Sequence, residues 1–194
     1  MIPILSDTEA MLLIQNARRG ATPALTRLYE LYADRVFRFV RARIIDAGTA
    51  EDLAADVFVS VVEKLDTFRP GAGGTAASLT GWIFTIARNR VIDYQRQSGR
   101  RPTVELPDEQ GDELLPSHFK MDAPQIESVD LYNAIRNLTE EQQSVILLRF
   151  QQDLTFGQIA QTLGKTEEAV KALQRRALAS LARLLAEPYS AEQV

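Results

Sequence analysis

Two short stretches of this sequence are basic, although the whole chain of 194 residues carries a formal net charge of −4. Within residues 82–101 a single acid, Asp93, accompanies Arg88, Arg90, Arg96, Arg100 and Arg101. Within residues 165–183 two glutamates accompany Lys165, Lys171, Arg175, Arg176 and Arg183. Arginine and lysine pair with phosphate groups, and arginine also binds guanine through two hydrogen bonds. Both stretches are therefore candidate contacts for nucleic acid.

The first basic stretch predicts a helix with one face toward the protein core and another toward a ligand. The core face is expected to hold Leu79, Ile83, Ile86 and Ala87. Helical spacing gathers on another face Trp82, Asn89, Asp93, Arg96 and Arg100. Aromatic rings stack on unpaired bases, at about 1–3 kcal/mol per base, and an asparagine amide reads base edges. The alternative is that Trp82 is a core residue and the arginines form a solvated stripe.

The second basic stretch has the spacing of a helix-turn-helix motif. A short helix at residues 156–163, a turn at Gly164 and a longer helix from residue 167 are predicted. The second helix of such a motif lies in the major groove, where its first residues meet base edges. One turn into that helix stand Lys171, Ala172, Arg175 and Arg176. The alternative is a helical hairpin with a solvated basic face.

The elements that must position these residues are all predicted to be helices. Ser6 with Glu9 forms a capping box for the first helix, and Thr22-Pro23 begins the second. Gly48-Thr49 is predicted to end the second helix and cap the third. A glycine-rich loop at residues 69–74 precedes a helix at residues 79–98.

The amino-acid composition changes after this helix. Residues 101–124 are rich in proline and acidic residues, which predicts an extended linker. Beyond it, capping boxes at Thr139 with Gln142 and Thr155 with Gln158 indicate further helices. We therefore predict an all-α protein of two small helical domains, at residues 1–100 and 125–187, with a short tail at residues 188–194.

No set of residues supports a catalytic, metal or cofactor site. Cysteine is absent, and the one histidine, His118, lies in a polar stretch. The loop at residues 71–74 lacks the lysine and the preceding strand of a phosphate-binding loop. No apolar run reaches the ~20 residues that span a bilayer, and the N-terminus has no signal-peptide pattern. The prediction is a non-enzymatic, cytoplasmic protein without cofactor or membrane insertion.

The basic helix at residues 82–101 and the helix-turn-helix motif, in this order and joined by an acidic linker, resemble the extracytoplasmic-function sigma factors of the sigma-70 family. The resemblance covers nearly the whole chain, and the order and spacing of its motifs make it specific. The motifs are Ala50–Leu53 with Val57 and Phe58, Gly81–Trp82 with Ile86–Asn89 and Asp93, Leu138–Gln142 with Leu147–Phe150, and Ile159–Ala160 with Leu163–Gly164 and Ala169–Lys171.

The resemblance implies a subunit that directs RNA polymerase to promoters and helps to open the DNA. The helix at residues 51–65 would dock on the clamp of the largest polymerase subunit through Asp52, Asp56, Phe58 and Glu63. The next helix would read the −10 element, with a flipped base in a pocket bordered by the preceding loop. Its implied DNA contacts are Trp82, Phe84, Arg88, Asn89, Arg90, Asp93, Arg96, Arg100 and Arg101, of which Phe84 and Asn89 match the pocket.

The resemblance also gives roles to the rest of the chain. The last helix would read the −35 element through Lys171, Ala172, Arg175 and Arg176, and its domain would meet the flap of the second-largest subunit. The linker would thread toward the active-centre and RNA-exit channels, although its acidity is also explained by solubility alone. An anti-sigma protein holds many members of the family inactive, and the sequence leaves open whether one binds this chain.

The sequence departs from the family pattern in two places. The loop at residues 69–78 is long and glycine-rich, so its base pocket is expected to differ. The sequence at residues 171–178 leaves the −35 preference unassigned.

A free-standing helix-turn-helix repressor or activator is the competing hypothesis. It would explain residues 139–186 but not the face from Trp82 to Arg101. It would bind two half-sites about one helical turn apart.

Overall fold

The computed structural model describes residues 5–71, 74–99 and 129–186, and within these ranges it confirms the all-α class. The helices are α1 (Asp7–Arg18), α2 (Thr22–Arg41), α3 (Ala47–Lys64), the 3-10 turn η1 (Leu65–Thr67), α4 (Thr75–Gln97), α5 (Val129–Arg136), α6 (Glu140–Phe150), α7 (Phe156–Leu163) and α8 (Glu167–Ala186). The only β pairing in the described ranges is an isolated bridge between Gly71 and Gly74. The linker predicted for residues 101–124 and the tail predicted for 188–194 lie outside the described residues.

Side-chain caps fix the start of several helices, as the sequence predicts. Capping boxes are present at Ser6 with Glu9, Thr139 with Gln142, and Thr155 with Gln158. Each satisfies two backbone N–H groups that have no partner within the helix. Gly164 ends α7 with a left-handed φ of 64°, a conformation that glycine adopts without a steric penalty.

The predicted boundary between the second and third helices is wrong. It was placed at Gly48-Thr49, but α2 ends at Arg41 and α3 begins at Ala47. The cap is Asp46, whose Oδ1 accepts hydrogen bonds from the backbone N (2.8 Å) and Oγ1 (2.7 Å) of Thr49. A carboxylate accepts both donors and also interacts favourably with the helix N-terminus, which explains why Asp46 caps α3.

The N-terminal helices α1 to α4 pack around buried aromatic rings. Phe39 of α2, Phe84 of α4 and Phe68, between η1 and α4, are at most 1% exposed. Burying such a side chain stabilises the fold by roughly 1.5–3 kcal/mol. The helix α4 begins at Thr75, before the predicted start at residue 79, and contacts α1, α2 and α3.

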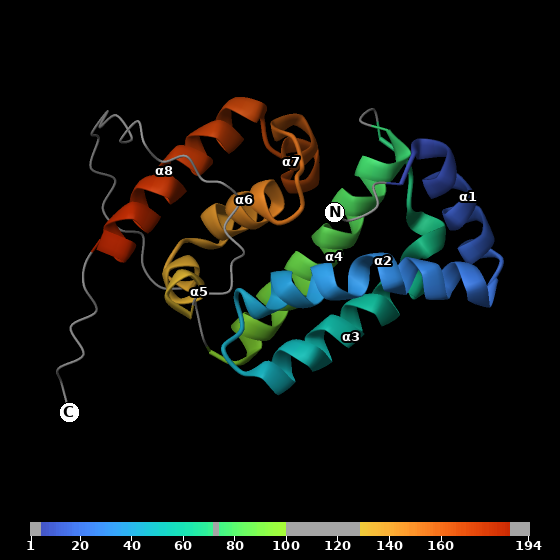
Figure 1. The fold of residues 1–194 in the computed structure, drawn as a ribbon, viewed down its shortest axis with the longest axis horizontal. Coiled ribbons are helices and arrows are strands. Elements are labelled where there is room, and N and C mark those ends of the chain that lie inside the picture. Colours follow the sequence, from blue (N-terminus) through green and yellow to red (C-terminus); the bar gives the residue numbers. More distant parts are fainter. Residues whose placement is uncertain (1–4, 72–73, 100–128, 187–194) are drawn as a thin grey trace.

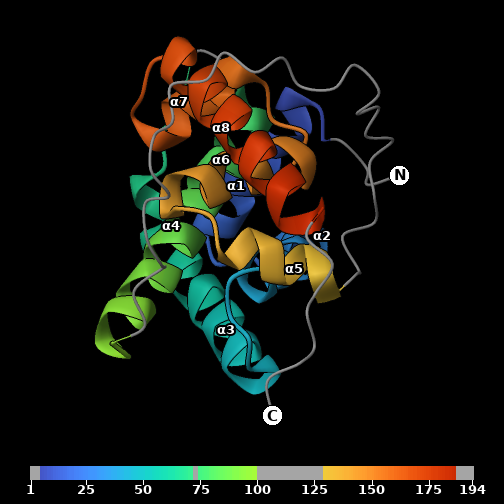
Figure 2. The ribbon, with the colours of Figure 1, turned by 90° about the vertical axis from the view of Figure 1, so that its left-hand side faces the viewer.

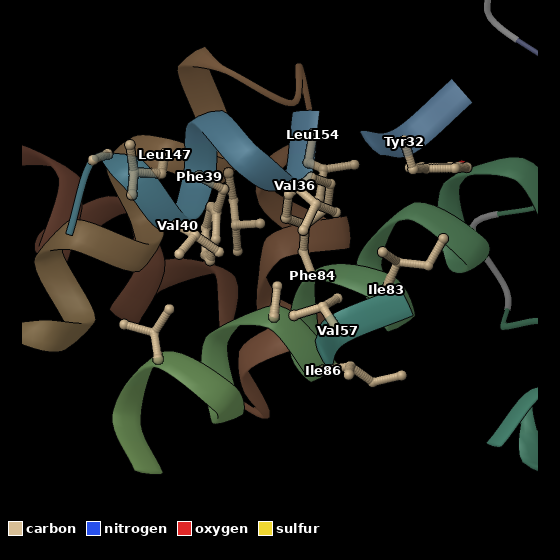
Figure 3. Packing of buried hydrophobic residues seen from close by; sticks show 14 of the residues in the cluster. Tyr32, Val36, Phe39, Val40, Val57, Ile83, Phe84, Ile86, Leu147 and Leu154 are labelled. Carbon is tan, nitrogen blue, oxygen red and sulfur yellow. The ribbon is translucent and has the colours of Figure 1, made fainter. Parts of the chain in front are cut away.

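The C-terminal helices α5 to α8 lie directly against this bundle, with α7 packed on α4 (Figure 1). Figure 2 shows α6, α7 and α8 gathered on one side of the molecule and α3 on the other. Leu147 of α6 and Leu154 after it belong to the same buried cluster as Val36, Phe39 and Phe84 (Figure 3). The described residues therefore share one continuous core, and the two groups of helices form a closed arrangement.

Candidate nucleic-acid interface

The two faces predicted for α4 are present. Leu79, Ile83, Ile86 and Ala87 are buried, at most 8% exposed. The polar face carries, exposed to solvent, Asn89, Asp93 and Arg96. Arg100 and Arg101 lie outside the described residues. One side of α4 is therefore anchored in the core while an amide, an acid and a guanidinium remain accessible on the other.

The two aromatic side chains at the start of this helix differ in exposure. Trp82 is half-buried, with its ring centroid 5.4 Å from that of Phe68. It is therefore neither wholly a core residue nor a fully free stacking surface. Phe84 is 0% exposed and meets the Phe39 ring edge-on at 5.1 Å. In this arrangement the Phe84 ring has no surface that a base can reach.

The arginines on either side of Asn89 are both paired with carboxylates. Arg88 Nη2 donates to Glu140 Oε1 at the start of α6. Arg90 Nη2 lies 3.3 Å from Asp56 Oδ2 of α3, a residue predicted to contact polymerase. These pairs link the predicted DNA face to two other elements and neutralise its charge around Asn89.

The helix-turn-helix spacing is confirmed, and α8 follows α7 through the turn at Gly164. The predicted contact residues Lys171, Arg175 and Arg176 are exposed, and Ala172 is half-buried. Lys171 Nζ lies 3.9 Å from Glu167 Oε2 and 5.7 Å from the centre of the Phe156 ring. This surface of α8 carries cations that can pair with phosphate or with a guanine edge.

The outer face of α3 combines acids with exposed apolar side chains. The predicted residues Asp52, Asp56 and Glu63 are exposed, and Phe58 is half-buried with its ring 4.9 Å from that of Tyr29. Sequence analysis did not single out Val59 and Val62, which are 56% and 50% exposed. The sequence pattern that could have identified them is a pair of valines three residues apart, outside the buried stripe of Leu53, Val57 and Val61. Such a pair indicates a second apolar face on the helix.

Polar contacts connect the two groups of helices around the shared core. Arg35 Nε of α2 donates to Gln152 Oε1 at 2.7 Å, and Arg136 Nη2 of α5 donates to the Arg41 carbonyl at 3.1 Å. On α4, a Cβ added at Gly81 would lie 2.5 Å from Thr162 Oγ1 of α7. The absence of a side chain at Gly81 is therefore what permits this close approach of α4 and α7.

Arg43 is buried at this contact with its hydrogen bonds only partly satisfied. Its Nη2 donates to Ser144 Oγ at 2.8 Å, and its guanidinium lies 4.2 Å from the centre of the Phe39 ring. Its Nε and Nη1 have no hydrogen-bond partner. Burial and, secondly, the nearby Arg88 charge lower the pKa of Arg43 to about 9, although Glu140 acts in the opposite direction. The closed arrangement thus encloses a cation at an energetic cost.

The described part of the chain holds neither a candidate metal site nor a candidate membrane span. Among these residues no three His, Cys, Asp or Glu side chains gather in a way that could hold a metal ion. None of the described helices is both long and apolar enough to cross a membrane.

Comparison with protein families finds two matches in chain order. Residues 28–101 match sigma-70 region 2, which includes most of α2 and all of α3 and α4, and residues 134–183 match sigma-70 region 4, which includes α6, α7 and most of α8. The chain is 35% identical over 184 residues to the ECF RNA polymerase sigma factor BldN of Streptomyces coelicolor, covering 93% of this chain and 67% of BldN. It is 34% identical over 158 residues to the ECF RNA polymerase sigma factor RpoE of Cereibacter sphaeroides, covering 80% of this chain and 82% of RpoE.

Solved structures with a similar fold include two protein complexes. CnrH, solved with the cytosolic domain of CnrY, matches with a TM-score of 0.65 at 23% identity, covering 90% of this chain and 95% of CnrH. RpoE of Bartonella quintana, solved with the anti-sigma factor NepR, matches with a TM-score of 0.61 at 21% identity, covering 84% of this chain and 98% of that one.

Proposed function

This chain belongs to the extracytoplasmic-function sigma factors of the sigma-70 family, and from that premise we propose which of its residues read the promoter and bind polymerase. As a member of this family it is a non-enzymatic factor for promoter-directed transcription initiation with RNA polymerase. We expect it to act in the bacterial cytoplasm, where promoter DNA and polymerase are located.

The −10 element is read by the exposed face of α4. The observation that carries this assignment is Asn89, an exposed amide between Arg88 and Arg90 on a helix whose opposite side is fixed in the core. Asn89 offers hydrogen bonds to a base edge, the half-buried Trp82 offers part of a stacking surface, and Arg96 faces the backbone. Asp93 lies one turn after Asn89 and completes the face.

The −35 element is read by α8 and polymerase is bound mainly by α3. On α8 the proposed contacts are Lys171, Ala172, Arg175 and Arg176. On α3 the proposed clamp contacts are Asp52, Asp56, Phe58 and Glu63, to which the exposed Val59 and Val62 add apolar area. The flap of the second-largest subunit would meet the domain that contains α6 to α8. An anti-sigma factor, the class of protein bound to RpoE of Bartonella quintana, is the second partner that we propose.

The two DNA readers must separate before they can act together. Elements at −10 and −35 lie about 25 base pairs apart, which is about 85 Å of duplex at 3.4 Å per base pair. A compact chain of this length has a radius of gyration of about 16 Å, so the closed arrangement is too small to reach both. Promoter binding therefore requires α7 to leave α4, and Arg88 to exchange Glu140 for DNA.

The test is to add the protein to sigma-free core polymerase with a library of promoters. We expect it to bind core and to start transcription at defined sites that share −10 and −35 sequences. Failure to bind core or to select start sites would refute the proposed roles of these surfaces. Specific binding of duplex DNA by the protein alone, with two protected half-sites about one helical turn apart, would favour a dimeric repressor instead.

A further inference from the structure

The helix α1 precedes the part of the chain that matches sigma-70 region 2, which begins at residue 28, yet it contacts both α4 and the segment that leads into it. We propose that α1 positions the −10 reader, because Asp7 and Arg18 hold the two ends of the loop before α4. This inference rests on the proposed role of α4 in reading the −10 element.

Asp7 caps α4 from a different helix. The residue at the N-cap position of α4 is Gly74, which supplies no side-chain acceptor. Instead, Asp7 Oδ1 accepts a hydrogen bond from the backbone N of Ala76 at 2.9 Å. Gly74 has a φ of +91°, and a Cβ there would lie 2.5 Å from Asp7 Oδ2. Both the backbone conformation and the adjacent carboxylate therefore require glycine, and Asp7 fixes where α4 begins.

Arg18 holds the other end of the loop. Its Nε donates to the Leu65 carbonyl at 3.2 Å, and its Nη2 donates to the Phe68 carbonyl at 2.6 Å. Phe68 is 1% exposed, and its ring centroid lies 5.4 Å from that of Trp82. Arg18 is thus connected through Phe68 to the aromatic side chain proposed to face the −10 strand.

Between these two polar contacts the packing of α1 against the loop is incomplete. A hollow of about 200 Å³ lies there, with walls that include Met11, Ile14, Phe68 and Pro70. Ile14 and Phe68 are nevertheless buried, at 4% and 1% exposed, so they anchor α1 against the residue that ends η1. Asp7 and Arg18 add directional hydrogen bonds at the two ends of the loop, which fix the orientation of α1 there.

The experiment uses holoenzyme assembled from core polymerase and the full chain. The probe is a fork-junction DNA that carries a −10 element selected from the promoter library, with a matched or a mismatched single-stranded base. For Asp7→Ala we expect about fivefold weaker binding of the matched probe, which corresponds to the ~1 kcal/mol typical of losing a helix cap, and a smaller ratio of matched to mismatched affinity. For Arg18→Met we expect a loss in the same direction. Asp7→Asn keeps an oxygen acceptor for Ala76 N and should restore most of the discrimination.

Two control variants separate positioning from a general loss of stability. Glu9→Ala removes the hydrogen bond from the Ser6 backbone N to Glu9 Oε2 (2.8 Å), weakening α1 without touching the loop. Arg19→Met changes the exposed neighbour of Arg18. Both should retain base discrimination, and all variants should retain core affinity. An equal loss of discrimination in Glu9→Ala, or unchanged discrimination in Asp7→Ala and Arg18→Met, would overturn the inference.

The same probe distinguishes failure of this inference from failure of the proposed function. If Asn89→Ala abolishes base discrimination while Asp7→Ala and Arg18→Met preserve it, α4 reads the −10 element and only the role of α1 is refuted. If the wild-type holoenzyme shows no discrimination between the probes, the proposed role of α4 is refuted, and the inference about α1 falls with it.

Discussion

At the scale of single residues, the proposed DNA contacts of the closed protein differ in exposure and in whether they are paired with a carboxylate. Asn89 and Arg96 are exposed, whereas Arg88 and Arg90 are bound to Glu140 and Asp56. The Arg90–Asp56 pair is exposed, and exposed ion pairs contribute only about 0–1 kcal/mol, so a phosphate can replace Asp56 at modest cost. The Arg88–Glu140 pair is half-buried, so Arg88 becomes available only when Glu140 moves away with its helix. The amide of Asn89 is therefore the group on this face whose removal should affect DNA recognition most directly.

For Asn89→Ala we expect impaired promoter opening with unchanged core binding. The side chain is exposed, so its removal leaves no cavity in the fold. Losing base contacts should reduce the affinity for a −10 single strand by about 1–3 kcal/mol. Abortive transcription from duplex and pre-opened templates, together with a core-binding titration, provides the measurement. Equal loss of core binding and opening would instead indicate a folding role.

At the scale of the elements, the closed arrangement depends on how closely α7 approaches α4. Gly81 permits this approach, and Thr85 Oγ1 of α4 lies 3.5 Å from the Thr162 carbonyl at the contact. Glycine inside a helix costs roughly 0.8–1.0 kcal/mol relative to alanine. Gly81 therefore lowers the intrinsic stability of α4 while it allows the two helices to pack.

For Gly81→Ala we expect a more open molecule whose α4 is intrinsically more stable. The new Cβ would lie 2.5 Å from Thr162 Oγ1, so α7 must shift or the Thr162 side chain must rotate away from the Gln158 carbonyl, to which it donates at 2.8 Å. Cysteine is absent from the chain, so Arg19→Cys and Arg183→Cys give specific sites for two fluorophores. Energy transfer between them should fall in Gly81→Ala.

The matched control for this prediction is the double variant Gly81→Ala with Thr162→Ala. Removing Thr162 Oγ1 relieves the clash, so energy transfer should return to the wild-type value. If Gly81→Ala alone leaves the transfer unchanged, the contact between α4 and α7 tolerates the extra methyl group and is not what limits opening.

At the scale of the whole molecule, the closed state combines an apolar core that favours it with a buried cation that opposes it. Leu147 and Leu154 join the cluster around Phe39, while Arg43 lies beside that ring with Nε and Nη1 unpaired. The pKa of Arg43, lowered to about 9 by burial, is still above neutral pH, so the guanidinium stays charged. Separation of the domains would return this charge to water, which offsets part of the loss of apolar burial.

For Arg43→Met we therefore expect a more stable closed state and weaker transcription. Replacing a whole buried ion pair with apolar side chains of similar volume is often neutral or stabilising, by about 1–4 kcal/mol, and Arg43 has no directly bonded carboxylate that its removal would leave unpaired. Ser144 Oγ stays satisfied because it also donates to the Glu140 carbonyl at 2.7 Å. The melting temperature should rise by roughly 2–4 °C per kcal/mol, and promoter-dependent transcript yield should fall.

The exposed Arg38→Met serves as the surface control and should shift stability by less than about 0.5 kcal/mol. A lower melting temperature for Arg43→Met than for Arg38→Met would show that the guanidinium holds the closed state together rather than opposing it.

Much of this protein follows from local sequence, because helix caps and helix faces depend on residues a few positions apart. Thr155 with Gln158, the turn at Gly164 and the buried and exposed sides of α4 were all predicted correctly. The misplaced boundary between α2 and α3 is also local, because Asp46 and Thr49 compete as caps and the carboxylate that accepts two donors from Thr49 prevails.

The tertiary structure alone decided which residues of these faces are available. The family resemblance assigned Phe84 to the predicted base pocket, but Phe84 is buried against Phe39, 45 positions away in the sequence. The partner of Arg88, Glu140, is 52 positions away and belongs to the other group of helices. Periodicity within one helix carries no information about such contacts. The sequence therefore indicated the helices that we propose to bind the promoter, and the packing between them determined that this protein adopts a closed arrangement.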